Sequence, residues 1–194
     1  MAGGGGAEAD AQSVSSSNTT PKTNEFDVAS SVVVGIDDAL ERLQSVDCNR
    51  LFGVFTFGDA IVSASDVMRD LQNVFAQRLT GGYGKSAYNI LVAVNPIPLS
   101  PTGTASGATV QTTGIIYNGT SNIGLPQVTL TLNNAAGAFS SFVPGGTKDQ
   151  TVTLLHELGH IMTALGGTQS WIGADGNDPV LSSTNTQRVE KECF

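Results

Sequence analysis

The residues best suited to chemistry lie together in one short motif within an apolar segment. The motif reads His156-Glu157-Leu158-Gly159-His160, and its two histidines are the only ones in the chain. If this segment is helical, residues four apart share a face, so the two imidazoles could hold one metal ion between them. The carboxylate of Glu157 would lie beside that ion and could take a proton from a bound water. The pattern therefore predicts metal-assisted hydrolysis, most often of a peptide bond.

The surrounding sequence favours a helix from about Lys148 to Leu165. Residues 147–150, Thr-Lys-Asp-Gln, have the form of a capping box, and Gly166-Gly167 supplies a stop. Apolar side chains recur at helical spacing between these signals, at Val152, Leu155 and Leu158. The alternative is a core helix on which the histidines only pack. Burying Glu157 there without a partner would cost several kcal/mol, which argues against that interpretation.

At these residues the sequence resembles the zincin metallopeptidases, whose active-site helix carries HExxH. The resemblance covers little more than this helix. It implies zinc ligation by His156 and His160, with Glu157 as the general base. In the metzincin branch the pattern extends to HExxHxxGxxH, but the matching positions here are Thr163 and Gly166, so that extension is absent.

Without another histidine, a three-ligand site must draw on a carboxylate, a tyrosine or a water. Gluzincins take a glutamate from a later helix, and the chain offers only Glu190 and Glu192, both near its C-terminus. Aspzincins use an aspartate beyond the second histidine, and Asp175 and Asp178 are available. The full aspzincin pattern, which includes a nearby tyrosine, is absent. The resemblance is therefore closest, in ligand type, to an Asp-ligand zincin.

We favour Asp175 as the third ligand. It lies in a glycine-rich loop that could fold back over the helix end, and Gly176 would let the backbone turn sharply. Asp178 is the close competitor, although an aspartate before proline also suits a turn or a helix cap. A polar surface loop is the alternative for both residues. The expected metal is zinc, because imidazole and carboxylate ligands suit it, though cobalt or manganese could substitute.

Composition indicates one domain at residues 26–194 and a disordered arm at residues 1–25. The chain has 194 residues, 40% of them hydrophobic, whereas the arm is rich in Gly, Ser, Ala and Thr. The net charge is −8, and the nine Lys and Arg residues form no basic cluster, which argues against nucleic acid or an anionic membrane as partner. We find neither a signal peptide nor a membrane-spanning run, and expect a monomer.

The remaining patterns predict an α+β fold, with a small mixed or antiparallel sheet packed against the active-site helix and other helices. Helices are expected at residues 27–46 and 66–79, the second capped by Ser65-Asp66, and a short helix after a cap at 182–185. Strands are expected at residues 88–94, 109–117 and 127–132. Residues 127–132 could be a plain strand or, as in zincins, an exposed edge that binds extended substrate.

The two cysteines, Cys48 and Cys193, each adjoin a predicted helix. A disulfide between them would pin the C-terminal helix onto the first helix and contribute on the order of 4 kcal/mol by restricting the unfolded chain. It would also indicate an oxidising compartment, and hence a secreted protein. The alternative is two unrelated buried thiols.

Together these features predict a secreted zinc metalloendopeptidase acting on protein or peptide substrates. The alternative is a secreted, non-catalytic metal-binding or interaction domain that retains the helix. Hydrolysis of a non-peptide amide would follow the same chemistry.

Overall fold

The computed structural model describes residues 25–80, 84–95, 108–112, 125–133, 148–168, 171–176 and 178–194. The predicted arm lies outside the described residues, except for Glu25, where the first helix begins. The helices are α1 (Glu25–Arg42), α2 (Val46–Arg50), α3 (Ala64–Leu79), α4 (Lys148–Ala164) and α5 (Pro179–Cys193). The strands are β1 (Val54–Phe57), β2 (Ala60–Ser63), β3 (Ile90–Asn95), β4 (Ala108–Thr112) and β5 (Val128–Asn133).

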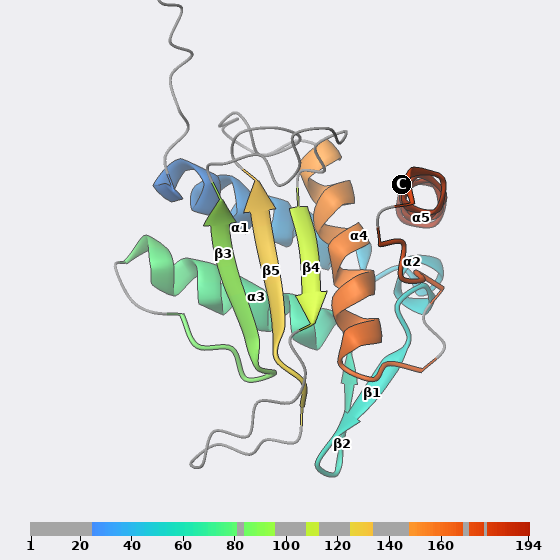
Figure 1. Ribbon diagram of the computed structural model, residues 1–194, viewed down its shortest axis with the longest axis horizontal. Coiled ribbons are helices and arrows are strands. Elements are labelled where there is room, and N and C mark those ends of the chain that lie inside the picture. The colour runs from blue at the N-terminus through green and yellow to red at the C-terminus, as the bar shows by residue number, and fades with distance from the viewer. Residues whose placement is uncertain are drawn as a thin grey trace, which may run out of the picture.

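The main sheet has three strands in the order β3-β5-β4. Strand β3 is parallel to β5, with Ile90 opposite Val128, whereas β4 is antiparallel to β5, with Val110 opposite Leu130. The fold is therefore α+β with a mixed sheet, as predicted. The possibility that residues 127–132 form an exposed edge is wrong, because β5 has a strand on each side. The strand that lies at the edge beside α4 is β4 (Figure 1).

Helices cover one face and one edge of this sheet and share one apolar core with it (Figure 1). Figure 1 shows α1 and α3 behind the sheet, with α4 alongside β4. Helix α4 contacts the helices α1, α3 and α5. Its buried apolar side chains are Val152, Leu154, Leu155, Leu158, Ile161 and Met162. Because this helix is embedded in the core, residues along it have fixed positions relative to the rest of the fold.

The ends of α3 and α4 follow ordinary capping chemistry. Helix α3 is capped by Ser63 rather than by the predicted Ser65: the Ser63 hydroxyl accepts from the Asp66 amide, and the Asp66 carboxylate accepts from the Ser63 amide at 2.9 Å. Helix α4 begins directly after Thr147, its predicted cap, which lies outside the described residues. It ends at the predicted glycines, where Gly166 has a φ of +91°.

A short hairpin, β1–β2, was not predicted from the sequence. It turns at Gly58, whose φ is +60°, and pairs Val54 with Ser63. Phe55 packs edge-to-face on Tyr88, with ring centroids 5.7 Å apart. Backbone hydrogen bonds between Val54 and Thr168 also connect the hairpin to the segment after α4. The hairpin therefore supports the chain just before it turns towards Asp175.

Cys48 and Cys193 form a disulfide, as predicted. The bridge joins α5 to the short helix α2, rather than directly to the first helix. The last residue reinforces this attachment, because Arg42 and Lys148 lie over the Phe194 ring, 4.5 and 5.0 Å from its centroid. None of the helices in the described part of the chain combines the length and the apolar composition that a bilayer crossing requires.

Candidate metal centre

Three side chains that could ligate a metal converge where α4 meets the loop that follows it. The Nε2 atoms of His156 and His160 lie 2.9 Å apart. Asp175 Oδ2 lies 3.0 Å from His156 Nε2, and Asp175 Oδ1 lies 3.3 Å from His160 Nε2. A tetrahedral zinc ion, with ligands at about 2.0–2.1 Å, would separate its ligand atoms by about 3.3 Å. The cluster therefore has the dimensions and the donor types of a divalent metal site.

The other carboxylates considered from the sequence have separate roles. Asp178 caps α5, where its side chain accepts hydrogen bonds from the backbone amides of residues 180 and 181. Glu190 pairs with Lys148 at 3.8 Å, and Glu192 pairs with the neighbouring Lys191. None of the three joins the cluster. The start of α5 also differs from the prediction, because the helix begins at Pro179 and residues 182–185 lie inside it.

The loop that carries Asp175 approaches α4 closely because Gly159 has no side chain. A Cβ placed there would lie 2.4–2.7 Å from atoms of Ile172, far closer than real contacts allow. Thr163 adds a hydrogen bond from its hydroxyl to the Ile172 carbonyl at 3.2 Å. At the far end of the loop, Gly176 has a φ of +52°, which supports the predicted turn. We did not single out Gly159 from the sequence, although a glycine inside a helix costs about 1 kcal/mol and so indicates a packing reason.

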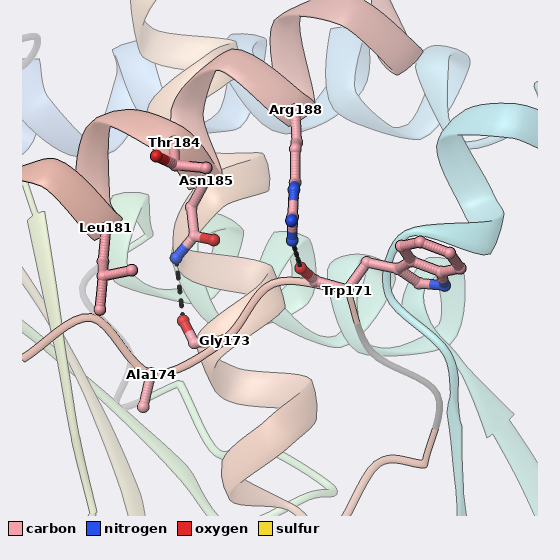
Figure 2. Close-up of a pocket in the computed structure, with 7 residues that line it drawn as sticks. All are labelled: Trp171, Gly173, Ala174, Leu181, Thr184, Asn185 and Arg188. Carbon is pink, nitrogen blue, oxygen red and sulfur yellow. Dashed lines mark hydrogen bonds between the residues drawn. The ribbon is translucent and has the colours of Figure 1, made fainter.

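Helix α5 holds the same loop from its other side. Asn185 is buried and donates through Nδ2 to the Gly173 carbonyl at 2.9 Å, two residues before Asp175. Arg188 donates through Nη1 to the Trp171 carbonyl at 2.6 Å. Figure 2 shows both hydrogen bonds, at the wall of a surface hollow between α5 and the loop. The position of Asp175 thus depends on both helices that flank its loop, α4 and α5.

Burial controls the protonation of the site. It lowers the pKa of His156, and the neighbouring His160 lowers it further, while Asp175 opposes both effects. A neutral imidazole is the form that binds metals. Burial raises the pKa of Glu157 to about 8, and the charge of Asp175 contributes to the rise.

Glu157 shows the clearest sign that a positive charge belongs beside it. Only 6% of its surface is exposed, and its Oε2 atom has no hydrogen-bond partner in the described part of the chain. A buried carboxylate oxygen without a partner is costly, so such an atom calls for an explanation. A cation held by His156, His160 and Asp175 would supply one, and the residues present therefore fit a metal ion.

Comparison of the chain with protein-family models, with curated proteins and with solved structures gives no match. A functional conclusion must therefore rest on the geometry of the site itself.

Proposed function

We propose that the protein is a zinc-dependent metallopeptidase of the zincin type. His156, His160 and Asp175 would hold the zinc ion, and Glu157 would act as the general base. The observation that carries this proposal is the convergence of three ligand atoms beside a buried glutamate. A structural metal site has no need of such a glutamate, whereas hydrolysis needs a group that accepts a proton.

When bound, zinc would supply a Lewis acid that lowers the pKa of a bound water towards neutrality. The two imidazoles would contribute neutral nitrogen donors, and Asp175 would contribute a negative charge. Glu157 would accept the proton of the attacking water and pass it to the leaving amine. Positive charge next to Glu157 favours its ionised form, which is the form able to act as a base.

The position of β4 supports a peptide as the substrate. In the described residues, β4 pairs with β5 on one side only, and it lies against α4, which carries both histidines. An extended peptide can bind to a free strand edge through backbone hydrogen bonds, so its scissile bond could be presented along the active-site helix. This is also the arrangement that the resemblance to zincins implies.

The disulfide supports the proposal that the protein works outside the cytosol. Disulfides persist in oxidising compartments, so the Cys48–Cys193 bridge agrees with a secreted enzyme. Its substrates would then be extracytoplasmic proteins or peptides.

The proposal is tested by metal content and hydrolysis measured on the full chain. We expect stoichiometric zinc by mass spectrometry, hydrolysis of casein or a peptide library, and loss of both after treatment with a chelator. Glu157→Gln keeps the shape of the side chain but removes the base, and should lower kcat about 10²- to 10⁴-fold while zinc is retained. Glu190→Gln, at an exposed ion pair away from the cluster, is the matched control and should hydrolyse normally.

Two outcomes would contradict the proposal. A chain that takes up no divalent ion would remove the metal site altogether. A chain that binds zinc but hydrolyses no peptide in the library would favour the non-catalytic metal-binding domain.

A further inference from the structure

We infer that Thr186 on α5 is a positioning residue of this metal site, which holds the His156 ring with its Nε2 atom towards the ion. The inference rests on the proposed metal site. The Thr186 Oγ1 atom lies 3.0 Å from Nδ1 of His156, the ring nitrogen that does not face the cluster. Thr186 is thirty positions from His156 in the sequence and reaches it only because α5 packs on α4.

The hydrogen bonds that the Thr186 hydroxyl can donate and accept suit this role. A hydroxyl has one proton to donate and two lone pairs that can accept. Thr186 lies 3.0 Å from the Ser182 carbonyl, which has no proton, so this bond uses the hydroxyl proton. The hydroxyl oxygen is then left to accept, and its partner Nδ1 must carry the ring proton. The Nε2 atom of His156 is thereby left with a lone pair for a metal.

The geometry also fixes the orientation of the ring. Thr186 is β-branched, and its bond to the carbonyl four residues earlier holds its hydroxyl in one direction. His156 is 6% exposed, so few waters could take the place of the hydroxyl. Without it, the Nδ1–H group would be buried with one partner fewer, at a cost in free energy that metal binding would have to overcome.

The test compares zinc affinities of full-length variants, measured by competition with a chromophoric chelator. Thr186→Val keeps the branched shape and removes the hydroxyl, and should weaken zinc binding about 10- to 100-fold. Thr186→Ser restores the hydroxyl and should bind zinc nearly as the wild type does. If valine disturbs the packing of α5, Thr186→Ala removes the same hydroxyl with a smaller side chain.

Thr184→Val is the matched control. Thr184 lies on the same helix and donates in the same way, to the Val180 carbonyl at 2.8 Å, but it is exposed. The substitution therefore reproduces the loss of a helix hydrogen bond without touching His156. Its zinc affinity should equal that of the wild type.

A spectroscopic measurement separates positioning from general loosening of α5. In the zinc-loaded protein, the Nδ1 proton of His156 should give a slowly exchanging, downfield NMR signal. Thr186→Val should remove this signal or shift it upfield, and should leave that of the chain's other histidine in place. Thr184→Val should change neither.

The possible failures are distinguishable. If the wild type binds zinc and Thr186→Val binds it equally well, or keeps the downfield signal, the role of Thr186 is overturned while the proposed metal site stands. Weakening of zinc binding to the same extent by Thr184→Val would also overturn it. If the wild type binds no zinc, both proposals fall together.

Discussion

The two halves of the candidate metal site are held in place by different means. The half on α4 carries His156 and His160 one helical turn apart, on a helix whose apolar side chains are buried in the core. The half formed by α5 and the loop carries Asp175, and is held by Asn185, by Thr186 and by the disulfide. Apolar packing over a long helix is distributed, whereas a few polar contacts and one covalent bond can each be removed singly. The α5 half is therefore where the site can be weakened selectively.

Removal of the disulfide should give the largest difference in local stability between the α4 half and the α5 half of the site. The bridge closes a loop with a sequence separation of 145 residues, so the Cys48→Ser/Cys193→Ser double variant should lose about 4–5 kcal/mol of unfolding free energy. Hydrogen exchange should show greater loss of protection in α5 than in α4, because α4 retains its core contacts. Equal loss of protection in the two helices would contradict the claim that α5 depends on the disulfide more than α4 does. Chemical reduction of the wild type provides the control.

Substitution of Asp175 should affect metal binding without affecting α4. Asp175→Ala removes a proposed ligand and should weaken zinc binding about 100-fold or more, since even groups that only support a ligand account for 10- to 100-fold. Asp178→Ala is the matched control: it removes the α5 cap and should cost about 1 kcal/mol of stability, with zinc affinity nearly unchanged. Zinc competition and denaturant unfolding measure the two effects. If the Asp178 variant lost more zinc affinity than the Asp175 variant, Asp178 rather than Asp175 would be the third ligand.

Glu157→Gln should stabilise the metal-free protein, with a gain that depends on pH. Folding raises the pKa of Glu157 from 4.5 to about 8, so the folded chain binds the proton more tightly than the unfolded chain does. The stability due to the protonated side chain is complete below about pH 4.5 and is lost as the pH rises to about 8.

Glutamine avoids this loss, so we expect the variant to exceed the wild type in unfolding free energy by on the order of 4 kcal/mol at pH 8 and by less than about 1 kcal/mol near pH 5. Urea unfolding in the presence of a chelator at several pH values measures the difference. A difference that stays constant with pH would show that Glu157 does not titrate in this way. Because Glu157 lies on α4, this effect should arise without any change in α5.

Asn185→Ala should give the smallest effect, and it tests whether α5 helps to position the loop that carries Asp175. The substitution removes the hydrogen bond to the Gly173 carbonyl and should cost about 1–2 kcal/mol of stability. Because this bond positions the loop of Asp175, zinc affinity should also fall several-fold. Gln187→Ala, at an exposed residue of the same helix whose amide contacts Ser183, should leave both quantities unchanged. Normal zinc affinity in Asn185→Ala would show that Ile172 and Gly176 suffice to place the loop.

Sequence reasoning succeeded where the signals are local. The extent of α4 follows from its apolar spacing and its glycine stop, and the turn at Gly176 follows from its residue type. The convergence of Asp175 with the histidines was a reasonable expectation, since a short loop after a helix can reach back to it. The disulfide could be proposed because the chain has only one possible cysteine pair.

The failures have physical causes. The β1–β2 hairpin has strands of four residues, too short for a clear alternating pattern. The cap at Ser63 could not be told from Ser65, since both are serines close to the start of the same helix. The alternation in β5 shows that one face is buried but says nothing of which strands lie beside it. Thr186 and Asn185 gave no signal, because their roles depend on how α5 packs against α4 and the loop between the two helices.

Asp175 lies in the sequence between the two histidines and the start of α5, so a metal ion bound to it would connect the core to the C-terminal segment. An ion bound at all three residues would act as a removable crosslink between the core and the C-terminal segment, in parallel with the covalent one at Cys193. Thermal stability should then depend on free zinc, with a gain of about 4 kcal/mol at 1,000 times the dissociation constant. A chain stripped of the ion and reduced would keep its core but release α5, so the protein would be most open to proteolysis under both conditions together.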